Sequence, residues 1–183
     1  MLFRSFKGNP AIEVQQVVAL INNGQYANSL KLLDKMTILP FEGAREGKII
    51  YEQASLLMSM DLIAKKKYSD AIKMIEKSKE YPERLGVGKP YTVDTRIQDY
   101  LNIYCLEKLN RKSETEPLKK SISEISDRRR GLSYSNILTI KVLNDMGNNS
   151  AADEMVSKMA ESRIPAQQWV AAVAKNEIGR AHV

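Results

Sequence analysis

One turn pattern recurs along the chain and limits the folds that it can adopt. The three clearest copies begin at Gly24, Lys66 and Gly147. Each copy has a small residue five positions after its first residue and an aliphatic residue nine positions after it. These residues are Ser29 and Leu33, Ala71 and Ile75, and Ala152 and Val156. A weaker fourth copy runs from Asn110 to Leu118, with Thr115 in the small position. The pattern predicts a turn followed by a helix that packs closely on the preceding one, and therefore an array of helix pairs.

Helical signals also dominate between these turns, and no run of residues favours a strand. We expect eight or nine helices. They are predicted from Pro10 to a break at Asn22, over 26–36, from about Ala44 to Lys65, from Tyr68 to Tyr81-Pro82, from a cap at Thr92 or Asp94 to Asn110, from about Ser113 through Ile125, over 134–143, over 151–159, and after Pro165. The expected fold is all-α, a right-handed solenoid of antiparallel helix pairs that forms one domain over residues 1–176.

Apolar residues at helical spacing predict which faces are buried. In the helix at 44–65 the residues expected to face inward are Ile49, Ile50, Leu56, Leu57, Met60 and Ile63. In the fifth helix a wide apolar face is expected from Ile97, Tyr100, Leu101, Tyr104, Cys105 and Leu109.

The turn pattern resembles the tetratricopeptide repeat, whose second helix opens with a Gly-x-Tyr-x-x-Ala pattern and often ends before a proline, as at Pro82. Successive copies here are 42, 44 and 37 residues apart, against about 34 in that family. The stretches 32–43 and 81–91 further resemble the C-terminal repeat region of large bacterial proteins. Those proteins carry an upstream β-rich domain of unknown function, of a kind found beside carbohydrate metabolism. The resemblance implies that this chain is the tail of a longer protein.

Composition excludes several classes of function. The chain has one cysteine, Cys105, and one histidine, His182, so cysteine-rich zinc sites and histidine relays lack their parts. The net charge is +6, but each basic cluster has acidic neighbours, which is typical of solvated helix surface. We expect no cofactor, no metal, no nucleic acid and no membrane partner. The N-terminal residues lack the apolar region of an export signal, so a cytoplasmic location is expected.

Three other features resemble binding or catalytic motifs, but for each of them a structural role is favoured. The Gly86-Val87-Gly88-Lys89 segment lacks the earlier glycine, the following Ser or Thr and the preceding strand of a phosphate-binding loop, so it is interpreted as a connection. Cys105 is expected to pack in the core. The carboxylates at Glu76, Glu80, Glu83, Asp153 and Glu154 are expected to be solvated. We therefore predict a protein without enzymatic activity.

Repeat arrays commonly bind partners on the surface formed by the first helix of each pair. Alignment on the turns places Met60, Tyr100, Tyr104 and Lys108 on that surface, and these are the candidate partner-binding residues. The expected partner is a protein, a peptide or an upstream domain of the same polypeptide. The same side chains could instead pack only against neighbouring helices. Two further alternatives are an accessory region of a larger carbohydrate-related enzyme and an RNA-binding helical repeat.

The last seven residues, 177–183, do not continue the helical pattern. They can be encoded by a sequence similar to a common sequencing adapter. We interpret them as a non-native or disordered tail, in which His182 is an artefact; an ordinary frayed polar tail is the alternative.

Overall fold

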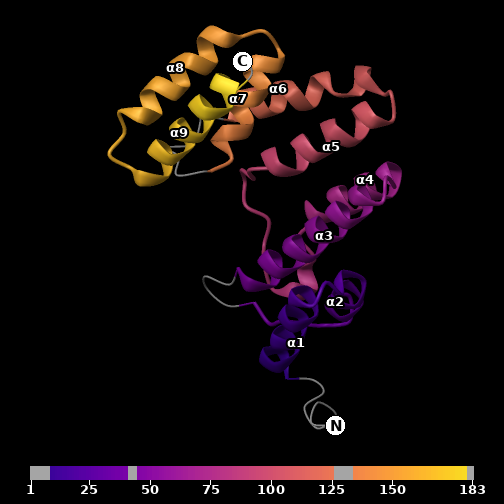
Figure 1. Ribbon diagram of the computed structural model, residues 1–183. Helices are drawn as coiled ribbons and strands as arrows, with labels where there is room; N and C mark the ends of the chain where they lie inside the picture. The colour runs from indigo at the N-terminus through magenta and orange to yellow at the C-terminus, as the bar shows by residue number, and fades with distance from the viewer. Residues whose placement is uncertain (1–8, 41–44, 126–133, 181–183) are drawn as a thin grey trace. The chain divides into compact units, whose positions relative to one another are not determined.

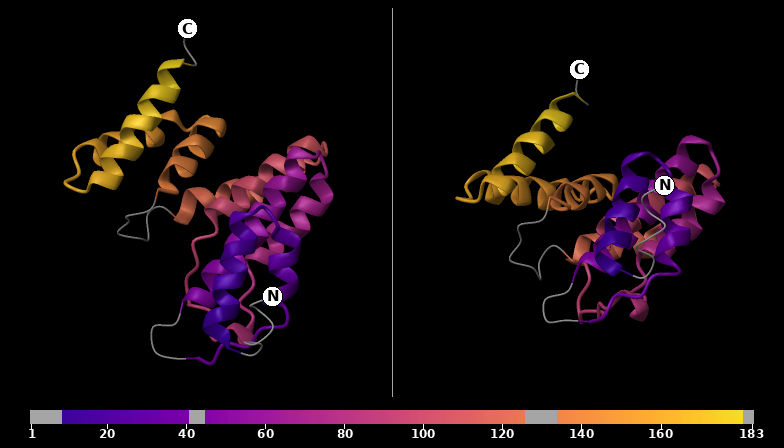
Figure 2. Two further views of the ribbon diagram at one scale, coloured as in Figure 1. Left: turned by 60° about the horizontal axis from the view of Figure 1, so that its bottom comes forward. Right: turned by 90° about the horizontal axis from the view of Figure 1, so that it is seen from below.

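The computed structural model describes residues 9–40, 45–125 and 134–180, and all of the regular structure in these stretches is helical (Figure 1). This confirms the all-α class. The chain divides into two compact units, Met1–Val93 and Asp94–Val183, where the sequence predicts a single domain. Each unit is described below by itself. Figure 2 gives two further views.

The N-terminal unit consists of two helix pairs and a short 3₁₀ helix. Its elements are α1 (Pro10–Asn22), α2 (Tyr26–Leu33), α3 (Glu46–Ala64), α4 (Tyr68–Ser78) and η2 (Glu83–Leu85). The start of α1 is as expected, because the Asn9 side chain caps the helix and Pro10 is its first residue. Helices α1 and α2 pack together, α3 packs on α4, and α2 packs on α3. One apolar cluster joins them. Its buried members include Val17, Ile21, Leu33, Met36, Ile50, Tyr51 and Leu85.

The C-terminal unit contains two further pairs and a last helix. Its elements are α5 (Arg96–Lys108), η3 (Lys112–Glu114), α6 (Glu116–Ile125), α7 (Asn136–Asp145), α8 (Asn149–Ala160) and α9 (Pro165–Arg180). Helix α5 packs on α6 and α7, and α7 packs on α8 and α9. Helix α9 continues to Arg180, past the end near Asn176 that the sequence pattern favours. His182 lies outside the described residues, and the origin of the tail stays a prediction.

The four predicted turns have the same backbone structure in the described chain. Gly24, Lys66, Asn110 and Gly147 all have a positive φ, between 58° and 78°. At each turn the amide of the following residue donates to the carbonyl five residues earlier, as Gln25 does to Leu20 and Asn148 does to Leu143. This is the Schellman arrangement, which ends a helix and satisfies its last carbonyls. The turn pattern in the sequence therefore identifies real helix ends.

Lys66 occupies a backbone conformation that costs an L-residue about 1 kcal/mol, whereas glycine adopts it without strain. We expect Lys66→Gly to raise the free energy of unfolding by up to about 1 kcal/mol, because the relief of strain exceeds the added chain entropy. Urea denaturation measures the change. The Asn110→Gly variant is the comparison and should gain less, because asparagine tolerates this conformation better. A loss of stability in Lys66→Gly would contradict the account.

The small residue of each copy is buried where two helices meet. Ser29, Ala71 and Ala152 are fully buried, and Thr115 is 1% exposed. The aliphatic residues Leu33, Ile75 and Val156 are buried as well. The alignment of the four turns is confirmed at these positions.

Ala71 in α4 has no exposed surface, so a larger side chain there must displace α3. We expect Ala71→Leu to cost about 1–3 kcal/mol through overpacking. Thermal unfolding measures the cost. Ala27→Leu, at an exposed position of α2, is the matched control and should change the stability little. Equal effects of the two substitutions would show that the burial of Ala71 does not matter.

Sequence periodicity does not identify the buried face of α3 correctly. Of the six apolar residues expected to face inward, only Ile50 is buried, and Ile49 and Met60 are exposed. Beside Ile50 and Leu62, the buried face is formed by small, aromatic and polar residues, namely Gly47, Lys48, Tyr51, Ala54, Ser55 and Ser59. Small side chains let α3 approach α4 closely, and a pattern based on large apolar residues misses them.

Two loops pack on each other beside the start of α3. The Ile38 amide donates to the Arg84 carbonyl at 2.8 Å. The Arg84 guanidinium bonds Asp34 at 2.8 Å. Gly86, with φ +70°, lies so close that an added Cβ would be 2.6 Å from the Ile38 oxygen. The two stretches that carry the resemblance to the bacterial repeat region are thus in direct contact, and Gly86 closes η2.

Candidate functional site

The first helices of the third and fourth pairs bury the same repeat positions. Five buried residues of α5 have buried counterparts at the same distance from the turn in α7. The equivalent pairs are Asp99 and Asn136, Asn102 and Thr139, Ile103 and Ile140, Cys105 and Val142, and Leu106 and Leu143. Helices α5 and α7 therefore bury equivalent residues, although only α5 keeps large apolar residues exposed.

Large apolar side chains are exposed on α5, on α9 and just before α7. Ile97 and Tyr134 are each thirteen residues before the left-handed residue of their turn, and they are 44% and 62% exposed. Tyr134 lies edge-on against Trp169 of α9, with ring centroids 5.5 Å apart. Trp169 is 53% exposed and Tyr104 is 41% exposed. We call Ile97, Tyr104, Tyr134 and Trp169 the aromatic row.

The four predicted partner-binding residues fall in different surroundings. Tyr104 and Lys108 lie together, with the Lys108 Nζ 5.3 Å from the ring centroid of Tyr104. Tyr100 is only half-buried and packs against the cluster formed by Ile103, Ile122 and Val142. Met60 is 53% exposed on α3, at the repeat position that Tyr104 occupies on α5. The structure thus brings Tyr104 and Lys108 together, while Met60 belongs to the N-terminal unit.

Tyr134 and Trp169 were not among the predicted partner-binding residues. Both were expected on apolar helix faces, as parts of the seventh and ninth helices. The turn alignment could have identified Tyr134, because it places this residue at the position of Ile97. No comparable turn follows α9 within the described residues, so Trp169 had no such signal.

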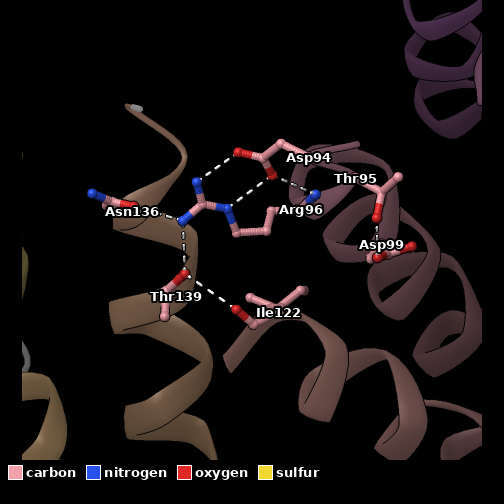
Figure 3. Close-up of polar contacts among 7 residues, drawn as sticks. All are labelled: Asp94, Thr95, Arg96, Asp99, Ile122, Asn136 and Thr139. Atoms are coloured by element: carbon pink, nitrogen blue, oxygen red, sulfur yellow. Dashed lines mark hydrogen bonds and ion pairs between the residues drawn. The ribbon is translucent and has the colours of Figure 1, made fainter. Parts of the chain in front are cut away.

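A buried arginine joins α5 to α7 (Figure 3). Arg96 is 1% exposed, although it is the first residue of α5. Its Nη2 is 2.6 Å from Asp94 Oδ2, and its Nε is 2.9 Å from Asp94 Oδ1. Its Nη1 donates to Asn136 at 2.6 Å and to Thr139 at 3.2 Å. Both edges of the guanidinium group are therefore hydrogen-bonded, one to the Asp94 carboxylate and the other to side chains of α7.

The buried arginine cluster, which we define as Asp94, Arg96, Asn136 and Thr139, also reaches α6. The Thr139 hydroxyl lies 3.4 Å from the Ile122 carbonyl oxygen, to which it donates. Thr139 of α7 is thereby joined to α5 through Arg96 and to α6 through Ile122. Because Asp94 pairs with the guanidinium, and Asn136 and Thr139 accept its remaining hydrogen bonds, the cluster suits structural support of α5 and α7 better than chemistry.

This cluster corrects the expected face of α5. The sequence predicts an apolar inner face that includes Ile97 and Tyr104, but these are exposed. The buried face includes the polar residues Arg96, Gln98, Asp99 and Asn102. The N-cap of α5 is Thr95, not Asp94 or Thr92 as the sequence suggests, although the amide of Arg96 donates to the Asp94 side chain at 3.2 Å.

A second polar network lies in the N-terminal unit at the C-terminal end of α4. The buried Lys48 side chain donates to the Ser78 carbonyl oxygen and pairs with Glu52 at 3.0 Å. The Tyr51 hydroxyl donates to Glu80 at 2.8 Å. Burial, and then the neighbouring Glu80 carboxylate, raise the pKa of Tyr51 far above its usual range. Lys48 thus satisfies the end of α4, and Tyr51 stays neutral at physiological pH.

Cys105 is fully buried on α5, as expected, and burial raises the pKa of its thiol to about 11. The thiolate is the nucleophile, so at pH 7.5 the folded protein should react with iodoacetamide much more slowly than the urea-unfolded chain. Mass spectrometry of the alkylated protein measures both rates. Equal rates in the two states would show that the thiol is not protected.

The described stretches hold neither a membrane-spanning helix nor a cluster of metal ligands. None of their helices is long and apolar enough to cross a bilayer. None of their His, Cys, Asp and Glu side chains gather in threes or more in a way that could hold a metal ion.

Comparison with known proteins gives no relative from which a role could be carried over. No family model, no curated protein and no solved structure matches the chain. The aromatic row and the arginine cluster must therefore be interpreted from their own geometry.

Proposed function

We propose that the chain is a non-enzymatic interaction scaffold of the tetratricopeptide type, which binds a peptide segment of a partner protein on the aromatic row. One observation carries the proposal. Four large apolar side chains, on α5, on α9 and just before α7, stay between 41% and 62% exposed within one compact unit. Two of them, Tyr134 and Trp169, are in contact, and an exposed apolar patch is typical of an interaction site.

The repeated local structure supports an array of the tetratricopeptide type. The four Schellman turns, the four buried small residues and the packing of each first helix on its second are the same in every copy. The solenoid arrangement of these pairs is part of the proposal. Packing alone explains the aromatic row less well, because its side chains keep much of their surface in contact with water.

The chemistry of the buried groups supports a binding role over catalysis. Cys105 and Tyr51 have raised pKa values, which makes the thiol and the phenol less reactive at neutral pH. Arg96 is held by four hydrogen bonds to Asp94, Asn136 and Thr139. Arg96 thereby holds α5 and α7, which lie beside the row.

A selection from a random peptide library on phage, with the full chain immobilised, tests the proposal. Selected peptides should change the fluorescence of Trp169, which is the single tryptophan of the chain. Tyr104→Ala and Tyr134→Ala should each weaken binding at least about tenfold, as expected for exposed aromatic anchors. Tyr91→Ala, which removes a fully exposed tyrosine outside the row, is the matched control. If no peptide is enriched, or if Tyr91→Ala weakens binding as much, the proposal fails.

A second candidate, an accessory region of a larger carbohydrate-related enzyme, follows from the resemblance of the two loop stretches and from the exposed apolar residues beside them. Leu39 lies in one loop and Ile49 lies near the start of α3 beside it, and both are exposed. A domain of the same polypeptide could pack there. Long-read sequencing of the locus tests this candidate. A reading frame that continues upstream of Met1 into a β-rich domain supports it, whereas a start codon with its own ribosome site at Met1 contradicts it.

A further inference from the structure

One side of α5 carries a stripe of four residues, Ile97, Leu101, Tyr104 and Lys108. They follow one another at separations of four, three and four residues, so they lie on one side of the helix over about 16 Å. Ile97 and Tyr104 are 44% and 41% exposed, Lys108 is exposed and Leu101 is half-buried. We call these four residues the α5 stripe. Its first three side chains are apolar or aromatic, and its last carries a positive charge.

The spacing of the α5 stripe indicates which kind of segment fits it. Alternating separations of three and four residues form the seam along which two α-helices pack. Neighbouring stripe residues are about 5 Å apart along the helix axis, as they would be on a second helix, whereas same-face residues of an extended peptide are about 7 Å apart. The other sides of α5 are already buried, at Arg96, Gln98, Asp99, Asn102, Ile103, Cys105 and Leu106. The stripe therefore suits an amphipathic helix better than an extended peptide.

The charge at the end of the α5 stripe indicates the chemistry of the partner. The Lys108 Nζ is 5.3 Å from the ring centroid of Tyr104, so the positive charge borders the aromatic part of the stripe. Glu107 is also exposed, but it lies about 100° around the helix axis from Lys108 and outside the stripe. A carboxylate that approaches along the stripe is attracted by Lys108, whereas a lysine or an arginine is repelled.

We propose that the partner segment is an amphipathic helix, which packs its apolar side along Ile97, Leu101 and Tyr104 and places a glutamate or aspartate side chain beside Lys108. This inference rests on the proposed function, because it names the class of peptide that binds the aromatic row. The acidic residue lies one seam position, three or four residues, beyond the last apolar residue of the segment.

A phage library of alanine-rich helical peptides, selected on the immobilised full chain, tests the proposal. Three consecutive seam positions carry Leu, Ile, Met or Phe, and the next seam position carries Glu, Gln or Lys. The charged position is at the C-terminal end in half of the library and at the N-terminal end in the other half, which covers both orientations. At low salt the chain should enrich Glu over Lys about five- to tenfold, and about 0.5 M NaCl should reduce this preference.

Variants of α5 assign the preference to Lys108. Lys108→Glu should reverse it in favour of Lys, and Lys108→Gln should abolish it. Glu107→Gln, one residue away and outside the stripe, is the matched control and should keep it. Lys108 lies in the last turn of α5, where a cation suits the helix dipole, so its loss also affects stability. Lys108→Gln is the milder change and serves where Lys108→Glu does not fold, as circular dichroism shows.

The outcomes separate this inference from the proposed function. Binders without a preference for Glu, or with the same preference in Lys108→Gln, overturn the acidic partner and leave the scaffold role intact. A central proline in a selected peptide should abolish binding, so equal binding of that variant overturns the helical partner. Amidation of the peptide's C-terminus should change nothing, and a loss would overturn the proposal because the terminal carboxylate would be the group recognised. If neither this library nor the random one gives a binder, both proposals fail.

Discussion

Replacing Arg96 by leucine should lower the free energy of unfolding of the C-terminal unit by about 3 kcal/mol or more, although the new side chain is apolar and suits a buried site. Removing one member of a buried pair leaves the other without compensation. Here the Asp94 side chain, only 19% exposed, would lose the guanidinium that it binds through both oxygens, and the Asn136 oxygen would lose the donor that lies at 2.6 Å. Urea denaturation followed by circular dichroism measures the loss.

A second arginine provides the matched control. Arg111 binds Glu114 through two contacts of 2.6 Å, so its geometry is as good as that of Arg96 with Asp94. The pair lies on the surface, where solvent screens it, so Arg111→Leu should change the stability little. Arg96→Lys keeps the charge but loses the planar fork, and it should fall between the two leucine variants. If both leucine variants were equally stable, burial of the Arg96 pair would have no energetic consequence.

The second large effect concerns Gly86, at the contact between the two loops of the N-terminal unit. Gly86→Ala should cost about 2–4 kcal/mol, because a left-handed backbone strains an L-residue and the new Cβ would meet a carbonyl oxygen. That oxygen belongs to Ile38 and lies 2.6 Å from the Cβ position. Because it is backbone, it cannot move away without shifting the loop. Thermal unfolding of the full chain measures the effect on this unit.

Other glycines separate the two causes. Gly24 has the same φ of +70° but open space around it, so Gly24→Ala reports strain alone, about 1 kcal/mol. Gly47 has ordinary helical geometry but would place its Cβ 2.4 Å from the Leu85 oxygen, so Gly47→Ala reports the clash. Gly88 has neither feature, and Gly88→Ala should leave the stability unchanged. If Gly86→Ala cost no more than Gly24→Ala, the loops would not be packed as described.

The sequence predicts the helix ends well because turn chemistry is local. The turn residue and the small residue five positions later can be recognised in the sequence without any knowledge of tertiary packing. In all four copies the turn residue has a left-handed backbone and the small residue is buried. Pro10 and Asn9 likewise define the start of α1 by themselves. The aromatic row was predicted in part, since Tyr104 follows from the same alignment, together with its neighbour Lys108.

The buried faces of α3 and α5 were not predictable in this way. Periodicity assigns large apolar residues to the inside, but α5 has apolar residues on more than one side, and its partners decide between them. Arginine is also among the residues that are seldom buried, so Arg96 gave no signal. Its burial depends on Asp94, which is two residues away, and on Asn136, which is forty residues away. The contact with Asp94 is local, whereas the contact with Asn136 depends on the tertiary packing of α5 and α7.

The buried arginine cluster has a consequence for the order of the hairpins. In a chain of similar hairpins, apolar contacts are interchangeable, and helices could pair with the wrong neighbour during folding. The hydrogen bonds of Arg96 require an asparagine and a threonine one helical turn apart, as α7 provides with Asn136 and Thr139. α5 has a different polar pair, Asp99 and Asn102, at these positions. We expect Arg96 to make the third hairpin pair specifically with the fourth, because α7 carries this asparagine and threonine and α5 does not.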